Sequence, residues 1–162
     1  MERMQGGDDG RPTPPVVHEL ELPTTAQGLA PALERVDAIL RVAAVGARVR
    51  GRVQLLLEEA VMNVAMHGGL GDAAREPAVR LVLTLGADAV ALLLEDAGVP
   101  YDPRLAPPPQ RPATLAEAVP GGLGVHLMRT YARVIDYERR DGRNRLTLVL
   151  ERDPGGAPSP GR

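Results

Sequence analysis

The sequence contains no cysteine, and this absence removes thiol nucleophiles, disulfides and thiolate metal sites. All 19 basic residues are arginine. Without lysine, the chain cannot supply the phosphate-binding lysine of a Walker A loop or of a protein-kinase strand, nor a Schiff-base amine. Tryptophan and phenylalanine are absent and tyrosine occurs 3 times, which argues against a base-stacking surface for single strands. Any phosphate chemistry must therefore use backbone N–H groups, arginine or a metal ion.

Long apolar runs are missing as well. No segment approaches the roughly 18–20 apolar residues that a membrane span needs, and the N-terminal sequence MERMQGGDDG lacks the apolar region of a secretion signal. The net charge of −2 gives no global field that favours nucleic acid or an anionic membrane. We therefore expect a cytoplasmic protein with no nucleic-acid partner and no membrane partner.

The length of 162 residues is enough for one domain with one sizeable core. Residues 1–15 and 152–162 are polar and rich in glycine and proline, and we expect both to be disordered tails. The continuous segment 16–151 between them is the predicted domain.

Local patterns predict the elements of this domain. Alternating or apolar runs predict strands at 16–22 (an edge strand), 78–85, 89–95, 134–140 and 145–151, and helical spacing predicts helices at 25–44, 48–67 and 123–133. Gly46 is expected to cap the first helix at its C-terminus. Because the hairpins imply mostly antiparallel pairing, the predicted fold is an α/β two-layer sandwich, a mixed but mostly antiparallel sheet covered by helices on one face.

The second predicted helix carries the first of three polar clusters. Glu59, Asn63 and His67 are spaced four residues apart, so they form one row along the edge of an apolar stripe. Glu58 points about 100° away, toward the polar face. One interpretation is a carboxylate that accepts a proton beside an amide oxygen that holds Mg²⁺. The other is a boundary row of partly solvated side chains.

The second cluster begins at Asp96, at the end of an apolar strand, and continues through Gly98 to Pro103. A strand-ending Asp can place a carboxylate on a pocket floor, and a following glycine lets a flat ligand approach the backbone. A plain Asp-x-Gly turn is the alternative.

The third cluster is the glycine run 121–124, which opens the last predicted helix. Free N–H groups and the positive end of the helix dipole favour an anion there. A flexible hinge or a simple helix start is the alternative, and the glycine spacing is not that of the dinucleotide-binding fingerprint.

Together the clusters read E-x-x-x-N-x-x-x-H-G, D-x-G-x-P-x-D-P and G-G-L-G-V-x-L-M. This order resembles the three nucleotide-binding boxes of the Bergerat-fold (GHKL) ATPase and kinase superfamily, which includes gyrase and the histidine kinases. Within it, the sequence is similar to the small serine/threonine kinases that act as bacterial anti-sigma factors. The resemblance covers roughly residues 16–151 and implies a Bergerat ATP-binding fold.

The resemblance implies roles for individual residues. Glu59 corresponds to the general base that acts on the substrate hydroxyl, and Asn63 to the Mg²⁺ ligand. His67 matches a position near the phosphates. Asp96 corresponds to the acceptor of the adenine amino group, with Gly98 beside the base. The glycine box around the triphosphate maps onto Gly122, Leu123, Gly124 and Val125.

Two further segments matter in this comparison. The Pro-rich segment 103–120 corresponds to a mobile lid over the nucleotide, and Arg104 or Arg111 could close on phosphate from it. The segment Asn144 to Thr147 stands where many relatives have a Thr-Thr pair near the adenine.

The implied function is an ATP- and Mg²⁺-dependent serine/threonine kinase that phosphorylates a STAS-type anti-sigma-factor antagonist and holds a sigma factor inactive in a partner-switching pathway. A catalytically silent ATP-binding protein that acts through partner binding alone stays open as the alternative. The chain shows no helical hairpin with a phospho-accepting histidine, which argues against a two-component histidine kinase. Relatives are often homodimers, and the apolar group Leu55, Met62 and Met66 fits either an interface or a position under other helices.

Overall fold

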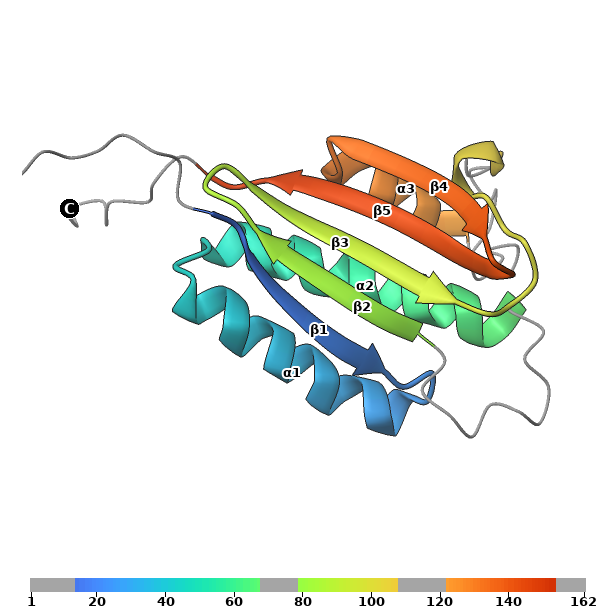
Figure 1. Cartoon of the computed structure of the whole chain (residues 1–162), viewed down its shortest axis with the longest axis horizontal. Helices are drawn as coiled ribbons and strands as arrows, with labels where there is room; N and C mark the ends of the chain where they lie inside the picture. Colours follow the sequence, from blue (N-terminus) through green and yellow to red (C-terminus); the bar gives the residue numbers. More distant parts are fainter. Residues whose placement is uncertain (1–13, 68–78, 108–121, 154–162) are drawn as a thin grey trace, which may run out of the picture.

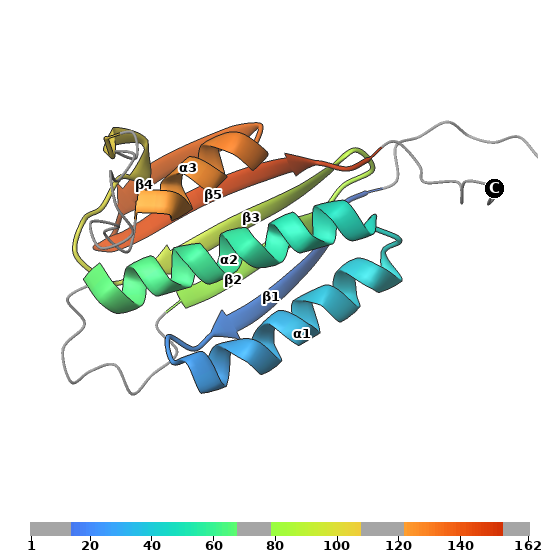
Figure 2. The same ribbon diagram turned by 180° about the vertical axis from the view of Figure 1, so that it is seen from behind.

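The computed structural model describes residues 14–67, 79–107 and 122–153. Its elements, in chain order, are β1 (Val16–Leu22), α1 (Ala26–Val42), α2 (Ala47–His67), β2 (Val79–Leu85), β3 (Ala89–Asp96), the 3₁₀ helix η2 (Pro103–Leu105), α3 (Gly122–Tyr131), β4 (Val134–Arg140) and β5 (Arg143–Glu151). The three α-helices lie on one face of a single sheet (Figures 1 and 2). The predicted two-layer α/β sandwich is confirmed.

The sheet has five strands in the order β1-β2-β3-β5-β4, and each neighbouring pair is antiparallel. No parallel pair occurs among the described strands, so the sheet is antiparallel rather than mixed. β1 lies at one edge, as predicted. The β4–β5 hairpin turns at Asp141 and Gly142, whose φ values are 51° and 77°. Positive φ at both central residues matches the twist of a two-residue hairpin, and it lets β5 begin at Arg143 rather than at the predicted residue 145.

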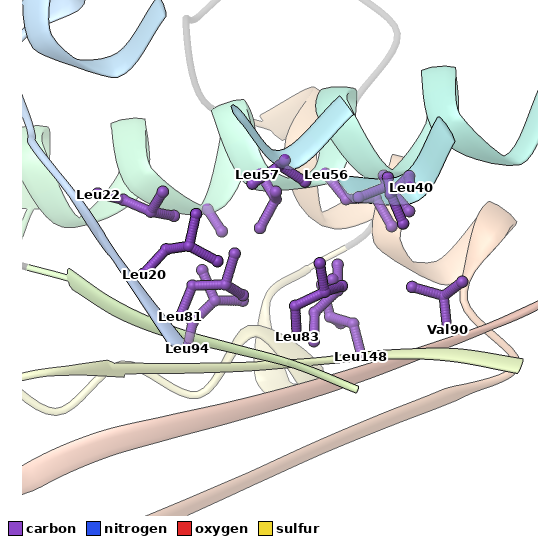
Figure 3. Close-up of a cluster of buried hydrophobic side chains, with 14 of the residues drawn as sticks. Leu20, Leu22, Leu40, Leu56, Leu57, Leu81, Leu83, Val90, Leu94 and Leu148 are labelled. Carbon is purple, nitrogen blue, oxygen red and sulfur yellow. The ribbon is translucent and has the colours of Figure 1, made fainter. Parts of the chain in front are cut away.

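The hydrophobic core fills the space between the helices and the inner face of the sheet (Figure 3). The apolar stripe that spacing predicts on α2 consists of Val49, Val53, Leu56, Ala60 and Val64. The first four are buried, and Val64 is partly buried. Leu57 and Val61 are fully buried as well, because α2 packs against α1 and α3 as well as against the sheet.

Burial alternates along β3, so that Val90, Leu92, Leu94 and Asp96 face inward. This alternation carries the carboxyl group of Asp96 to the helical side of the sheet.

The predicted cap at Gly46 is wrong. The chain leaves α1 at Ala44, whose φ is 54°. The N–H of Ala44 donates to the carbonyl of Arg41, and the N–H of Val45 donates to that of Leu40 at 2.9 Å. These two bonds form a Schellman motif, in which the residue that follows the left-handed residue packs back against the helix. Val45 is 5% exposed, so burying its side chain requires the chain to reverse before Gly46.

The outer face of the sheet carries a row of alternating charge across all five strands. Ion pairs at 2.7–2.9 Å link Glu19, Arg80, Glu95, Arg145 and Glu138 in that order. Hydrogen bonds from Arg80 to Glu19 and then to Glu95 raise the pKa of the Arg80 guanidinium. Cross-strand pairs of opposite charge support the observed register.

The predicted tails lie mostly outside the described residues, as do residues 108–120 of the predicted lid. Arg152, which the prediction assigned to the C-terminal tail, is held in place. Its N–H donates to the carbonyl of Asp88, and its guanidinium donates to the carbonyls of Gly86 and Ala43 at 2.7 Å each. Within the described ranges, no helix combines the length and apolarity needed to cross a bilayer.

Candidate functional site

A partly open pocket lies where the end of β3 and the start of β5 face α2 and α3. It is lined by Ala60, Asn63, Val64, Asp96, Val99, Tyr101, Pro103, Met128, Tyr137, Asn144 and Leu146. Most of these side chains are apolar or aromatic, and the few polar groups converge on the pocket, as is typical of small-molecule sites. Two of the residues singled out from the sequence, Asn63 and Asp96, meet in this wall although 33 positions separate them in the numbering.

Asp96 is the last residue of β3 and is 9% exposed. Its Oδ1 accepts hydrogen bonds from the N–H of Gly98 and from Nδ2 of Asn144, both at 2.8 Å. None of the hydrogen bonds among the described residues reaches Oδ2. The carboxylate is therefore anchored through one oxygen and keeps the other as an acceptor for a ligand.

Asn144 is the residue whose role the sequence did not reveal. It lies directly opposite Asp96 in the β3–β5 register and is 6% exposed. Its Oδ1 accepts from the hydroxyl of Tyr137 at 2.8 Å and from Arg139 at 2.7 Å. Its Nδ2 donates to the carbonyl of Val99 at 2.9 Å as well as to Asp96. The sequence marked Asn144 only as part of the segment that the resemblance places near the adenine. Its pairing with Asp96 depends on the strand register, which the sequence did not show.

Gly98 is buried in the loop after β3. Its N–H bonds to Asp96, and its carbonyl accepts from Arg139 at 3.0 Å. The backbone of Gly98 therefore holds the loop that follows Asp96. Gly98 is not among the residues that line the pocket, and its predicted place beside a flat ligand stays a prediction.

Glu59 and Glu58 lie on different sides of α2, as the periodicity predicted. Glu58 is exposed, whereas Glu59 is half-buried and faces α3. A Cβ atom built on Gly124 would lie 2.5 Å from Oε2 of Glu59. Asn63 lines the pocket and follows Glu59 by one helical turn. The contact between Glu59 and Gly124 therefore lies next to the pocket, at its rim, although neither residue lines it.

The remaining predicted residues flank this point. Gly122 opens α3, and Val125 is buried in its first turns at 4% exposure. His67 is the last residue of α2, and Leu123 is the second residue of α3. The side chains of His67 and Leu123 lie outside the described part of the structure.

Arg104, one of the two arginines suggested to close on phosphate, binds groups of the protein itself in this structure. Its guanidinium pairs with Asp102 at 2.9 Å and with Asp136 at 2.8 Å, and it donates to the carbonyl of Tyr137 at 3.1 Å. The side-chain hydrogen bond from Arg104 lowers the pKa of Asp102. Arg111 lies outside the described residues.

Arg129 of α3 anchors the segment that contains η2. Its guanidinium donates to the carbonyls of Ala106, Arg104 and Pro103 at 2.7, 3.0 and 3.4 Å. Pro103 is buried and lines the pocket. The pocket wall is therefore fastened to α3 on one side and, through Arg104, to β4 on the other.

Comparison with known proteins agrees with the observed fold. A family model described as histidine kinase-like ATPase domain matches residues 22–150. The chain is 35% identical over 135 residues to a protein of Bordetella bronchiseptica named serine/threonine-protein kinase BtrW, across 83% of this chain and 94% of that one.

A similar solved structure is that of the RsbU and RsbW domains of Rv1364c from Mycobacterium tuberculosis. The TM-score is 0.58 and the sequence identity 16%, over 88% of this chain. This chain spans 34% of that longer chain, and at such identity the likeness shows a shared fold. The family model, in contrast, spans most of this sequence and includes Asn63, Asp96 and Asn144. The chain belongs to the histidine kinase-like ATPase domain family.

Proposed function

We propose that this protein is an ATP- and Mg²⁺-dependent serine/threonine kinase that acts as an anti-sigma factor. Its protein substrate would be a STAS-type anti-sigma-factor antagonist, its second partner a sigma factor, and its location the cytoplasm. The observation that carries the proposal is the convergence of Asn63 and Asp96 on one pocket whose rim holds Glu59 against Gly124. Membership of the family and the likeness to a protein named as a serine/threonine kinase support the reaction class.

Two observations support an adenine nucleotide as the ligand of this pocket. Its walls are mainly apolar, and the acceptor Oδ2 of Asp96 suits the amino group of a purine. At the rim, Gly124 leaves no side chain between the start of α3 and Glu59. The backbone N–H groups of the first turn of α3 would then be available to phosphate oxygens.

Asn63 fits a cation that is held mainly by phosphate and water. Mg²⁺ usually takes one or two protein oxygens and fills its other positions with water and phosphate oxygens. No group of three or more His, Asp or Glu side chains forms a metal cage among the residues described. When bound, Mg-ATP supplies the phosphoryl group, and the cation neutralises charge that develops on it.

Glu59 is placed to act on the protein substrate. Its carboxylate stands one helical turn from Asn63 and against the backbone of Gly124. A half-buried carboxylate at this rim can accept the proton of a serine or threonine hydroxyl that approaches the pocket. Glu58, its neighbour in sequence, faces solvent and cannot reach the same hydroxyl.

Labelled phosphate transfer tests the proposal directly. Purified protein is incubated with γ-labelled ATP and with the STAS-type antagonists encoded in the same genome. We expect Glu59→Gln to lower the transfer rate by about 10²–10⁴-fold, the usual contribution of a general base. Glu58→Gln, the matched control, should transfer at the wild-type rate.

Each outcome has a distinct meaning. If wild-type protein binds ATP by calorimetry but labels no antagonist, the silent ATP-binding alternative replaces the kinase. If it binds no ATP, both readings fail. An unchanged rate in Glu59→Gln would show that Glu59 takes no part in the chemistry, and the kinase proposal would stand.

The segment that begins at Asn144 departs from the Thr-Thr pair of many relatives. The hydrogen bond from Asn144 to Asp96 supports nucleotide binding despite this departure.

A further inference from the structure

We infer that Asn144 is a positioning residue that makes the pocket select adenine over guanine by occupying one oxygen of Asp96. The inference rests on the proposed nucleotide site and adds to it the residue that sets base selectivity. Nothing in the three sequence clusters includes Asn144. Its importance comes from the strand register, which places it directly opposite Asp96.

The orientation of the Asn144 amide is determined by its partners. Its Oδ1 receives two donors, the hydroxyl of Tyr137 and the guanidinium of Arg139. Its Nδ2 faces only acceptors: Oδ1 of Asp96, the carbonyl of Val99 and, at 3.4 Å, the carbonyl of Gly98. A flipped amide would put its oxygen against these acceptors and its N–H groups against the two donors, so the amide must donate to Asp96.

This donation leaves Asp96 with one usable oxygen. Its Oδ1 already accepts from the N–H of Gly98 and from Asn144, which fills both lone-pair positions. Asp96 is 9% exposed and Asn144 is 6% exposed, so little solvent competes for the remaining oxygen. Oδ2 can therefore accept one well-placed donor from a base.

Adenine and guanine differ in the donors that they offer to a carboxylate. Adenine presents one amino group on its pairing edge, whereas guanine presents a ring N–H and an amino group side by side. Two adjacent donors bind best to both oxygens of a carboxylate at once. With Oδ1 of Asp96 occupied by Asn144, guanine loses its second bond while adenine loses nothing. In a buried site, a donor of the ligand that finds no acceptor strongly disfavours binding, so the pocket should prefer adenine over guanine.

Binding of ADP and GDP measured by calorimetry tests this inference without any phosphoryl transfer. We expect the wild-type protein to bind ADP more tightly than GDP. Asn144→Ala frees one lone pair on Oδ1, and it should lower the GDP-to-ADP ratio of dissociation constants by about tenfold, the effect of one charge-assisted hydrogen bond. Asn144→Thr can still donate one hydroxyl bond to Asp96 and should restore most of the ratio.

Two further variants complete the design. Arg143→Ala removes an exposed side chain on the same strand and should leave the ratio unchanged. Arg139→Met removes one of the two donors that orient Asn144, and it should lower the ratio by about threefold, because Tyr137 still holds the amide. Because Arg139 is exposed, we expect Arg139→Met to fold. It therefore tests the inference even if Asn144→Ala does not fold.

The outcomes separate this inference from the proposed function. If wild-type protein prefers ADP but folded Asn144→Ala and Arg139→Met keep the same ratio, Asn144 does not set selectivity although the nucleotide site stands. Equal loss of ADP and GDP affinity in Asn144→Ala would also overturn the inference, since a merely structural role lowers both. If the wild-type protein binds neither nucleotide, the site and the inference fail together.

Discussion

A Cβ atom on Gly124 would lie 2.5 Å from Oε2 of Glu59 and 3.1 Å from its Cβ. Helices α2 and α3 therefore approach each other at a point where only glycine fits without displacement. The glycine box and the proposed general base are thus parts of one contact, although they come from segments far apart in the chain.

Replacing Gly124 tests this contact. Gly124→Ala should push the Glu59 side chain away from its position and lower phosphate transfer by at least about tenfold, because positioning of a reacting group strongly affects rate. The measurement is transfer of labelled phosphate together with urea unfolding. Gly51→Ala is the matched control in α2, since nothing lies within 4 Å of its Cβ. The control should gain about 0.5–1 kcal/mol of stability and keep its activity; full activity in Gly124→Ala would contradict the functional contact.

Asn63 should couple nucleotide affinity to Mg²⁺. In wild-type protein, removing Mg²⁺ with EDTA should weaken ATP binding, whereas Asn63→Leu should bind ATP weakly and respond little to EDTA. The physical reason is that the variant lacks the one protein oxygen proposed to hold the cation. Gln54→Leu removes another side-chain amide from α2 that does not line the nucleotide pocket, and it should retain the wild-type response. A full EDTA response in Asn63→Leu would show that the cation is held elsewhere.

Asp102 should contribute to stability in a way that acid removes. The hydrogen bond from Arg104 lowers the pKa of Asp102 in the folded state. Its contribution is therefore complete above the unfolded carboxyl pKa of about 3.9 and is lost as the pH falls through the lower folded value. Urea unfolding between pH 7 and pH 2 should show a shallower acid decline for Asp102→Asn than for wild type. Parallel declines would show that the Asp102–Arg104 pair contributes nothing to the acid sensitivity.

Ala44 should gain stability when replaced by glycine. A non-glycine residue at φ 54° costs about 1–2 kcal/mol, so Ala44→Gly should raise the free energy of unfolding by about 1 kcal/mol. The preceding residue, Ala43, has φ −77°, and Ala43→Gly should lower that free energy instead. Equal effects of the two substitutions would indicate that backbone strain at Ala44 is not the cause.

Local sequence patterns were sufficient for most of the elements. Helical periodicity separated Glu59 from Glu58, and the apolar run 89–95 located the strand that leads to Asp96. Both results depend only on neighbouring residues, whereas the structure shows that Asp96 is the last residue of β3 and faces inward. The same reasoning failed at Gly46, because burial of Val45 against α1, rather than the location of a glycine, decides where that helix ends.

The roles of Asn144 and Arg104 could not be obtained in that way. Asn144 supports Asp96 only because β5 pairs with β3 in one particular register, and Arg104 binds Asp136 only because η2 reaches β4. The sequence by itself determined the helices, the strands and the side of α2 on which Glu59 and Asn63 lie, since these depend on local periodicity. Only the tertiary structure decided which side chains meet, because strand order and register arise from packing between segments that are distant along the chain.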